Sequence, residues 1–323
     1  MTTALLDVYL TEADGQAELR LDARTGLTAI PKVLPPKWFY DAAGSEIYER
    51  ITELPEYYPF NAEREILRAQ AGRIAEVSAA AALVELGSGS SEKTRLLLDA
   101  LGAHGTLRSY LPLDVSEAAL REATAALALD YPRLAVHGIV GDFTRHLSRI
   151  PRHGKRLLAF LGGTIGNLLP ADRAVFLRTV RATLRPGEQL LLGVGLVIDP
   201  AVMVPAYDDA QGVTAEFNRN VLRVLNRELG ANFDVDAFSH RALWNAEREW
   251  IEMRLRAGRR MTVHIEELGL DIPFAEGEEV RTETSAKFRP AGVRAELSAA
   301  GFELTEWWTD STNRFALALA TAH

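Results

Sequence analysis

Apolar and polar residues follow one rhythm over residues 81–197 of the chain. Short apolar runs of strand length recur there, and segments with apolar residues at helical spacing separate them. The strand-like runs are apolar at successive positions, as expected for strands with both faces covered. Strands that alternate with helices predict crossover connections and a parallel sheet, so the pattern indicates an α/β fold.

The same pattern places the individual elements of this sheet. The last helix of the region begins at Pro170 and ends at Gly187, the residues preferred at those ends. Ser116 stands where it can cap the helix before that one. Strands are expected within residues 81–87, 107–114, 134–142, 155–161 and 188–197, and helices within residues 92–105, 116–132 and 170–187.

The N-terminal segment does not open like a usual nucleotide-binding fold. A helix is expected over residues 38–54, between Pro36 and Pro55, and a second helix over residues 62–80. Four tyrosines gather in and beside the first helix, which we expect to pack with its aromatic face buried. They are Tyr40, Tyr48, Tyr57 and Tyr58.

The rhythm changes after Asp199. An amphipathic helix is expected over residues 214–230. Residues 250–268 carry apolar side chains at alternate positions on both sides of an Ala-Gly-Arg-Arg turn, which predicts a β-hairpin. We therefore predict an inserted α+β substrate domain over residues 200–285, with residues 1–199 and 286–323 forming the main domain.

The C-terminal segment returns to the main domain. A helix over residues 289–301 precedes two closely linked strands, at residues 302–310 and 314–321. The sheets of class I methyltransferases end in this way, with the last strand inserted antiparallel. The predicted fold is therefore a Rossmann-like class I methyltransferase sheet, mostly parallel with an antiparallel last strand, that carries a second, inserted domain.

Composition narrows the range of partners. The 323 residues include 36 Lys and Arg against 44 Asp and Glu, a net charge of −8, so nucleic acid is not an expected partner. The absence of cysteine removes disulfides and thiolate sites, and it fits a cytoplasmic protein. The seven histidines are scattered without metal-ligand spacing, so no metal is expected. The chain shows neither a membrane span nor a signal peptide, and we expect a monomer.

The segment LVELGSGSSEKT at residues 83–94 raises the question of which ligand binds at the first strand. Gly87 and Gly89 allow a backbone to approach a ligand closely. However, Glu92 stands where the dinucleotide fingerprint has its third glycine. Asp114 ends the next strand, 25 residues after Gly89, and a carboxylate there can accept hydrogen bonds from both ribose hydroxyls.

Three further residues at the strand ends suggest the rest of this ligand. Asp142 can accept a bond from the adenine amino group, and the ring of Phe143 can stack on the base. Lys93 can bind a carboxylate on the ligand. An adenosine with a carboxylate in place of a pyrophosphate is S-adenosylmethionine, and the order of these residues favours it over a dinucleotide. S-adenosylhomocysteine would be the product.

The loop after the fourth strand indicates the kind of acceptor. Enzymes that methylate exocyclic base nitrogens typically carry an Asn/Asp-Pro-Pro-aromatic motif there. This chain has LGGTIGN at residues 161–167 instead. Together with the negative net charge, this favours a small-molecule acceptor.

Six segments together resemble one known family. They are similar to the histidine-specific Nα-methyltransferases of ergothioneine biosynthesis, and the similarity runs over essentially the whole chain. The resemblance implies transfer of three methyl groups from S-adenosylmethionine to the α-amine of L-histidine, by way of its mono- and dimethyl forms, to give hercynine. The segments are LPPKWFYDAAGSEIYERITELPEYYP (34–59), LVELGSGSSEKTRLLLDAL (83–101), GDF (141–143), FLGGTIGNLLP (160–170), AYDDAQGVTAEFNRNVLRVLNRELGANFD (206–234) and TSAKFRP (284–290).

The resemblance also implies the site residues. Those for the cofactor are Gly87, Lys93, Asp114, Asp142 and Phe143, to which the loop adds Gly89. Those for histidine are Tyr57, Asn167, Tyr207, Glu283, Thr284 and Ser285, and Tyr40, Gly162, Thr214 and Met253 line the same pocket.

The chemistry of these side chains is consistent with such a substrate. Asn167 and Tyr207 can hydrogen-bond a carboxylate, and Glu283 and Ser285 can hydrogen-bond an imidazole. Aromatic rings around Tyr57 suit the trimethylammonium group that the reaction builds. The amine must lose a proton before each transfer, and Tyr40 or an ordered water is the expected proton acceptor.

The chain departs from the family pattern at three places, and two other functions compete. Gly195 and Ile198 replace an acid and a lysine after the fifth strand, and Ala286 replaces a cysteine. One alternative is methylation of another aromatic amino acid such as tryptophan, but Met253 and Glu283 would crowd an indole and leave a carboxylate unpaired. The other is a non-catalytic S-adenosylmethionine-binding protein, against which the intact cofactor loop argues.

Overall fold

The computed structural model describes residues 5–89 and 91–323, which divide into two compact units. The first unit comprises residues 5–10, Pro59–Val197 and Phe288–His323. The second unit comprises Thr11–Tyr58 and Ile198–Lys287. The sequence-based division placed all of residues 1–199 in the main domain, whereas in the structure Thr11–Tyr58 groups with the second unit.

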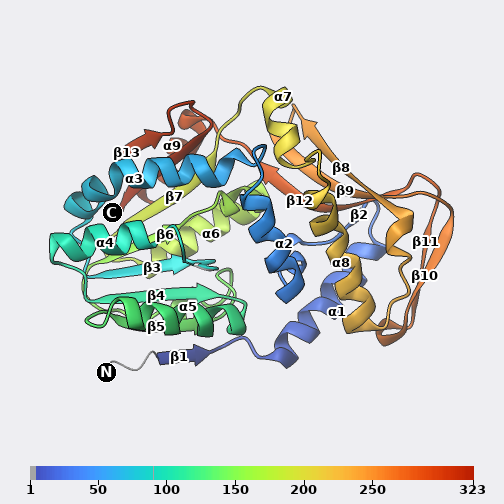
Figure 1. Cartoon of the computed structure of the whole chain (residues 1–323), viewed down its shortest axis with the longest axis horizontal. Coiled ribbons are helices and arrows are strands. Elements are labelled where there is room, and N and C mark those ends of the chain that lie inside the picture. Colours follow the sequence, from blue (N-terminus) through green and yellow to red (C-terminus); the bar gives the residue numbers. More distant parts are fainter. Residues whose placement is uncertain (1–4, 90) are drawn as a thin grey trace. The chain divides into compact units, whose positions relative to one another are not determined.

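The first unit is built on an eight-stranded sheet (Figure 1). Its strands are parallel through β7, and β14 lies antiparallel between β7 and β13. The predicted class I methyltransferase fold, with its antiparallel last strand, is confirmed. In spatial order the strands are β1 (Leu5–Val8), β5 (Ala135–Val140), β4 (Ser109–Asp114), β3 (Ala82–Leu86), β6 (Arg156–Phe160), β7 (Gln189–Gly195), β14 (Phe315–Ala322) and β13 (Phe302–Thr309).

Helices connect these strands and supply the rest of the core. Apolar side chains of α3 and α4 pack with those of β3, β6, β7 and β14 into one buried cluster. The strand order reverses between β3 and β6, and ligands of such sheets bind at the carboxyl ends near this reversal. The helices are α3 (Tyr58–Ser78), α4 (Arg95–His104), α5 (Glu117–Asp130), α6 (Pro170–Thr183) and α9 (Pro290–Ala299), with the short turns η2 (Leu147–Arg149) and η3 (Thr164–Asn167).

The second unit contains a four-stranded sheet and a separate two-stranded one. The first has the order β2 (Lys32–Val33), β12 (Glu279–Ala286), β9 (Trp250–Ala257) and β8 (Phe238–Asn245). The second pairs β10 (Met261–Ile265) with β11 (Leu270–Phe274). The predicted hairpin of β9 with β10 is wrong. Alternation identified the two strands and their apolar faces, but it carries no information about which strand pairs with which.

Helices from both segments of the second unit share one core. Residues of α1, α2 and α8 pack against β9 and β12. The helix predicted over residues 38–54 is interrupted, because Asp41 caps a new helix by accepting the N–H of Gly44 at 2.8 Å. The helices are α1 (Glu12–Thr28), α2 (Ala42–Thr52), α7 (Pro200–Met203) and α8 (Val213–Leu229), with the short turns η1 (Pro36–Phe39), η4 (Val204–Ala206), η5 (Val235–Ala237) and η6 (Glu266–Leu268).

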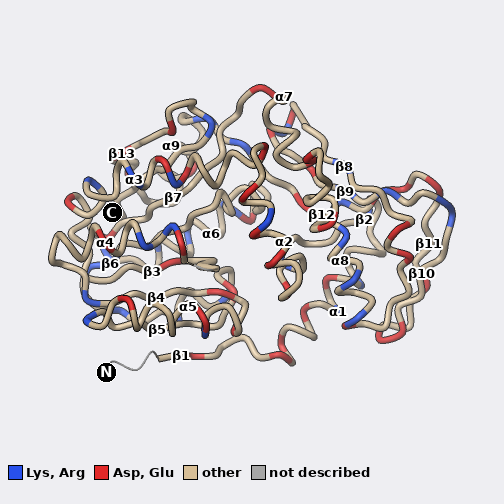
Figure 2. The backbone as a smooth tube through the Cα atoms, viewed as in Figure 1, with Lys and Arg blue, Asp and Glu red and all other residues tan. Residues whose placement is uncertain are grey.

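Charged residues of both signs are spread over residues 5–89 and 91–323. Lys and Arg are interspersed with Asp and Glu along the chain (Figure 2). None of the described helices has the length and apolar character of a membrane span. The same residues include no group of three or more His, Asp or Glu side chains arranged to hold a metal ion.

Candidate active site

The loop after β3 is closed by Glu85, a residue of the strand itself. Thr94, just before α4, and Tyr110, on β4, each donate a hydroxyl hydrogen to the buried Glu85 carboxylate. The Ser91 hydroxyl lies 2.9 Å from that of Tyr110. The acid that precedes the two glycines therefore ties the ends of the loop together rather than pointing to a ligand.

Stability should depend on pH through Glu85. Burial raises the pKa of Glu85 to about 7, although hydrogen bonds from Thr94 and Tyr110 oppose the rise. Between pH 4.5 and about 7 the folded chain holds a proton that the unfolded chain has released, so stability falls as pH rises. Glu85→Gln removes this titration. The free energy of unfolding of Glu85→Gln minus that of the parent should rise by about 2–4 kcal/mol between pH 4.5 and pH 8.

Urea unfolding over a series of pH values measures this change. Glu92→Gln is the matched control, because the side chain of Glu92 is 60% exposed. The control should follow the pH dependence of the parent. Parallel curves for the parent and Glu85→Gln would contradict the assignment of a buried, neutral Glu85.

Asp114 lies at the carboxyl end of β4, beside the glycine loop. Gly87 and Gly89 have φ angles of 67° and 47°, in the left-handed region that favours glycine. One Asp114 oxygen accepts the N–H of Gly89 at 3.0 Å, and the other accepts the N–H of Ser116 at 3.0 Å. Burial raises the pKa of Asp114, and these two N–H groups oppose the rise.

Phe143 offers a braced aromatic surface at the end of β5. Its ring centroid lies 5.0 Å from that of Phe160 and 5.7 Å from that of Phe176. The side chain remains half-buried. Beside it, Asp142 Oδ1 accepts the N–H and the hydroxyl of Thr144, each at 2.6 Å. The ring is thus supported by the core and still partly accessible, as stacking on a base requires.

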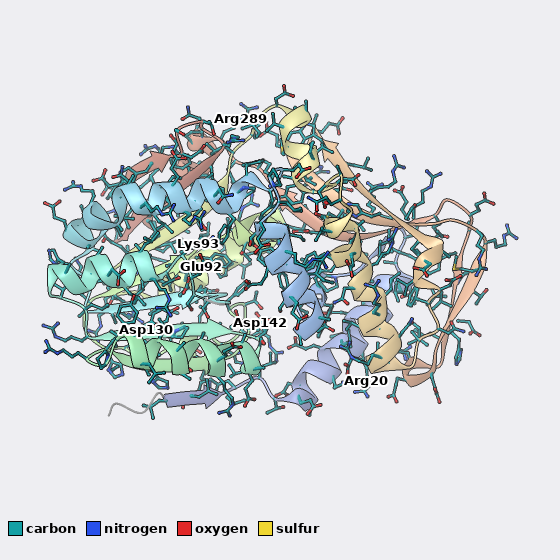
Figure 3. The ribbon with its side chains drawn as sticks, in the orientation of Figure 1. Arg20, Glu92, Lys93, Asp130, Asp142 and Arg289 are labelled. Carbon is teal, nitrogen blue, oxygen red and sulfur yellow. The ribbon has the colours of Figure 1, made fainter. Side chains whose placement is uncertain are left out.

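A buried glutamate on α3 joins Lys93 to the end of β6. Glu63 is 0% exposed and accepts a hydrogen bond from the Lys93 ammonium. The N–H of Gly162 lies 2.8 and 3.0 Å from the two Glu63 oxygens. A Cβ atom at Gly193 on β7 would collide with the same carboxylate. Figure 3 labels Lys93, and it also labels Asp142, which follows β5.

Glu63 was not among the predicted site residues, although the sequence carries a signal for it. Glu63 stands four residues before Leu67, on the apolar stripe that continues through Ala71 and Ile74. An acid on the buried stripe of a helix needs a partner, because an unpaired buried charge is costly. That partner is Lys93, the residue expected to bind a ligand carboxylate.

The first unit therefore carries, at the carboxyl ends of neighbouring strands, the residue types expected for S-adenosylmethionine. A carboxylate, a half-exposed ring and an ammonium follow β4, β5 and β3 in the predicted order. The space beside the loop is open, since Cβ atoms at Gly87 and Gly89 would meet nothing within 4 Å. These residues fit an adenosine with an amino-acid tail.

The second unit contains a cluster of aromatic rings. The ring of Tyr48 on α2 has its centroid 5.5 Å from that of Tyr40, 6.2 Å from that of Tyr57 and 6.0 Å from that of Phe217 on α8. Burial raises the pKa of Tyr57 well above its ordinary value, and the neighbouring tyrosines Tyr48 and Tyr207 add to the effect. Tyr57 is therefore a neutral hydroxyl, while Tyr40 is 37% exposed. The structure brings Tyr40 and Tyr57 together through Tyr48, which was not selected as a site residue.

A β-bulge in β12 controls the orientation of the residues predicted to contact the imidazole. Arg281 lies opposite Arg254 of β9, and Glu283 lies opposite Met253, which leaves Thr282 as the extra residue. Side chains of directly opposed residues project from the same face of a sheet. Glu283 and Met253 are therefore neighbours on one face.

The bulge also determines which side chains of β12 share the face of the core. Val280, before the bulge, is fully buried. Glu283 and Ser285, after it, project from the same face, although strict alternation would have turned residues at this spacing away from Val280. Met253 on this face is 1% exposed. The side chain of Thr284 projects from the opposite face, so the structure does not bring it together with Glu283 and Ser285.

Tyr207 is fixed by both its side chain and its backbone. Its hydroxyl lies 3.0 Å from Ser285 Oγ, and Lys287 Nζ donates to Tyr207 at 2.6 Å and to Ser285 at 2.9 Å. His240 Nε2 lies 2.8 Å from the Tyr207 carbonyl oxygen. Burial, together with the charge of Glu283, raises the pKa of Tyr207, which keeps its hydroxyl neutral. Tyr207 and Ser285 were among the predicted site residues, whereas Lys287 was not.

The remaining predicted residues lie in both units. Gly162 and Asn167 follow β6 in the first unit, where Asn167 ends η3 and is half-buried. Thr214 lies in the first turn of α8 in the second unit and is 3% exposed. Its N–H donates to Asp209 Oδ1 at 2.7 Å, which fixes the start of the helix.

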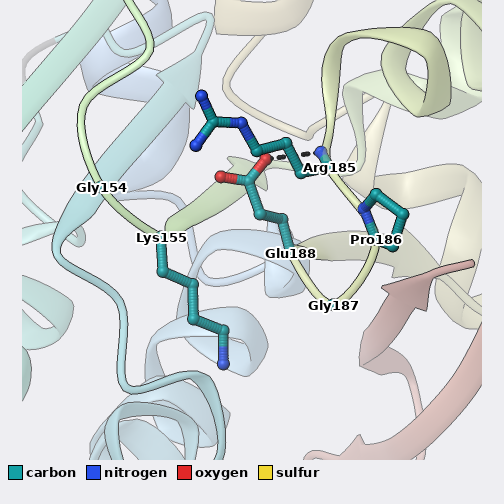
Figure 4. A pocket seen from close by; sticks show the side chains of 6 residues that line it. All are labelled: Gly154, Lys155, Arg185, Pro186, Gly187 and Glu188. Atoms are coloured by element: carbon teal, nitrogen blue, oxygen red, sulfur yellow. Dashed lines mark hydrogen bonds between the residues drawn. The ribbon is translucent and has the colours of Figure 1, made fainter.

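One pocket of about 370 Å³ lies away from these residues (Figure 4). It is found at the amino ends of β6 and β7, whereas the predicted cofactor residues follow the carboxyl ends of strands. Glu188 in this pocket accepts the N–H of Arg185 at 2.7 Å and the guanidinium of Arg156 at 2.6 Å. We assign no function to it. The lining residues are Gly154, Lys155, Arg185, Pro186, Gly187 and Glu188.

Comparisons with known proteins agree over nearly the whole chain. The profile of a family described as histidine-specific, SAM-dependent methyltransferases matches residues 19–322. The histidine N-alpha-methyltransferase of Mycolicibacterium smegmatis is 55% identical over 321 residues, 99% of each chain. That of Mycobacterium tuberculosis is 54% identical over 312 residues, 97% of each chain. Ergothioneine biosynthesis protein 1 of Neurospora crassa is 30% identical over 298 residues, 86% of this chain and 32% of that protein.

Proposed function

This chain belongs to the family of S-adenosylmethionine-dependent, histidine-specific methyltransferases, and we propose that it trimethylates the α-amino group of L-histidine to give hercynine. The observation that carries this proposal is the 55% identity with a histidine N-alpha-methyltransferase over 99% of both chains. A protein named for ergothioneine biosynthesis is also similar over 86% of this chain. The reaction is the first step of that biosynthesis.

The first unit provides the cofactor site in this proposal. S-adenosylmethionine, when bound, supplies an electrophilic methyl group on a positively charged sulfur. Asp114 accepts hydrogen bonds from the ribose hydroxyls, and Asp142 and Phe143 bind the adenine. Lys93 neutralises the cofactor carboxylate while Glu63 keeps the ammonium in place. Gly87 and Gly89 allow the backbone to lie against the ligand.

The second unit contains most of the residues that we assign to the amino acid. We assign Tyr207 to the carboxylate of histidine, and the family pattern gives Asn167 as a further histidine-binding residue. We assign Glu283 and Ser285 to the imidazole, because they share one face of β12. Tyr57, Thr214 and Met253 of this unit are further residues of the proposed site, whereas Thr284, which the family pattern also includes, projects from the other face of β12.

Positioning accounts for most of the catalysis that we propose. An in-line displacement needs a neutral amine held at a fixed distance and angle, with water excluded. We propose that the Tyr40 hydroxyl relays the amine proton, accepting it on its oxygen while its own hydrogen passes to a water molecule, since its side chain is 37% exposed. The rings of Tyr48 and Tyr57 offer aromatic faces to the cation that grows with each methyl group.

The proposed activity is tested by incubating the purified chain with S-adenosylmethionine and the twenty standard amino acids. Mass spectrometry should find histidine carrying one, two and finally three methyl groups, because the same site accepts the partly methylated forms. Reactions without the chain serve as the control. Methylation of tryptophan in place of histidine would overturn the acceptor. Cofactor binding with no methylated product would indicate a binding protein instead.

We further propose that the enzyme works as a monomer in the cytoplasm. The net charge of −8 disfavours nucleic acid, and the absence of cysteine suits a reducing compartment. Sedimentation at several protein concentrations tests the oligomeric state.

A further inference from the structure

Lys287 is a buried cation whose side-chain hydrogen bonds go to two neutral hydroxyls. The residue is 6% exposed, and its Nζ atom lies 2.6 Å from the Tyr207 oxygen and 2.9 Å from Ser285 Oγ. It also lies 4.6 Å from the centroid of the Tyr207 ring. Burial lowers the pKa of Lys287, and the charges of Tyr58 and Glu283 act in the opposite direction. A buried ammonium is costly unless its hydrogens are used and its charge is balanced.

The hydrogens of these three groups can be counted. An ammonium only donates, so both hydroxyl oxygens accept from Lys287. Tyr207 and Ser285 lie 3.0 Å apart and share one hydrogen bond, which uses one of their two hydroxyl hydrogens. One hydroxyl hydrogen therefore remains to be donated to another group, and the positive charge of Lys287 lies next to that hydroxyl.

One arrangement of these hydrogens satisfies the proposed substrate at both ends. If Ser285 donates to Tyr207, the Tyr207 hydroxyl is free to donate to a carboxylate oxygen. Ser285 Oγ then keeps a lone pair that can accept an imidazole N–H. The positive charge of Lys287 favours an anionic group at Tyr207 and disfavours an ammonium there.

We propose that Lys287, hydrogen-bonded to the Tyr207 and Ser285 hydroxyls, orients the Tyr207 hydroxyl as the donor that binds the carboxylate of the amino-acid substrate. This inference rests on the proposed function and adds a residue to it. Lys287 is a positioning residue, since it acts through Tyr207 and Ser285. Its effect should therefore depend on whether the ligand carries a carboxylate, which a purely structural role would not.

The test compares two ligands on two variants. Lys287→Met removes the ammonium and keeps an unbranched side chain, and Lys155→Met removes an exposed lysine at the amino end of β6. Binding of L-histidine and of L-histidinamide is measured by calorimetry with S-adenosylhomocysteine present. Histidinamide carries a neutral amide in place of the carboxylate.

Lys287→Met should weaken histidine binding by about tenfold to hundredfold and change histidinamide binding much less. Lys155→Met should bind both ligands as the parent does. An equal loss for the two ligands would overturn the proposal, and so would no loss for either. If Lys287→Met no longer binds S-adenosylhomocysteine, the same comparison is made on Lys287→Gln, which retains an amide donor without the charge. For Lys287→Gln too, an equal loss for the two ligands, or no loss for either, would overturn the proposal.

The absence of native cysteine offers a chemical rescue. Lys287→Cys can be alkylated at that one thiol with 2-bromoethylamine, in urea and before refolding, to restore an ammonium at nearly the original length. The alkylated protein should regain the preference for histidine over histidinamide, whereas the unmodified one should not. If the proposed function itself were wrong, the parent protein would neither bind nor methylate histidine. The parent therefore distinguishes that outcome from failure of the Lys287 proposal.

Discussion

The double variant Glu283→Ala with Met253→Val is expected to lose activity on histidine and to gain activity on tryptophan. The specificity constant kcat/KM for histidine should fall roughly 30- to 1000-fold if the lost hydrogen bond is buried and charge-assisted. This corresponds to a loss of about 2–4 kcal/mol. A site built to hydrogen-bond a polar group rejects analogues that lack it, because its own groups are left unpaired. Tryptophan should therefore be a very poor substrate of the parent.

The register of the second unit supports changing these two residues together. Glu283 lies directly opposite Met253, on the face that also carries Ser285. Without the Glu283 carboxylate, an indole that offers no matching donor no longer leaves a buried acceptor unpaired. Shortening Met253, which is 1% exposed, makes room on the same face. The two substrates should consequently respond in opposite directions.

A matched control separates specificity from stability. Glu279→Ala with Leu255→Val removes one acid of β12 and shortens one buried residue of β9, but Glu279 projects from the opposite face, where it binds Arg254 at 2.7 Å. Histidine should remain the preferred substrate of this control. Steady-state kinetics with both amino acids on both variants is the measurement. A parallel fall of the two activities in the test variant would show that Glu283 and Met253 support the fold instead.

Asp114→Ala should weaken binding of S-adenosylhomocysteine by about tenfold to hundredfold. The variant loses the acceptor for the ribose hydroxyls, and hydrogen bonds to a charged group are worth about 1.5–3 kcal/mol. It also frees the N–H groups of Gly89 and Ser116, which Asp114 holds at 3.0 Å each. Asp114→Asn keeps one oxygen for the backbone and should still bind the cofactor more weakly than the parent.

Asp130→Ala provides the control for this measurement. Asp130 is an exposed acid of α5 that pairs with Arg95 at 2.7 Å, and its side chain is 53% exposed. An exposed ion pair contributes little, so this variant should bind the cofactor product as the parent does. Calorimetric titration of all the proteins decides the matter. Unchanged affinity in Asp114→Ala would mean that the ribose lies elsewhere.

The place of the proposed cofactor residues at the ends of the strands could be predicted because it follows from local pattern. Parallel strands place their carboxyl ends at one edge of a sheet, so residues that follow successive strands must come close together. Asp114, Asp142 and Gly162 are found at such ends. What the pattern could not supply was Glu63, because its partners Lys93 and Gly162 lie 30 and 99 residues away.

The division of the chain into two units depends on pairing between strands that are far apart in the sequence. β2 is only two residues long, yet it pairs in parallel with β12, more than 240 residues later, and so joins the N-terminal segment to the second unit. The same limit explains the wrong hairpin. β9 pairs with β8 and β12, while β10 pairs with β11, and all four strands show the same kind of alternation.

Local patterns in the sequence were enough to predict the fold class, the order of the strands along the chain and the strand ends that carry the proposed cofactor residues, since each follows from short-range periodicity and from residues next to a strand. The tertiary structure alone decided how β12 presents its side chains. One extra residue at Thr282 shifts the alternation, so that Glu283 and Ser285 join the face of Met253 and Thr284 leaves it. It likewise decided the surroundings of Lys287, on which its proposed role depends. Tyr207, its partner at 2.6 Å, lies 80 residues away along the chain.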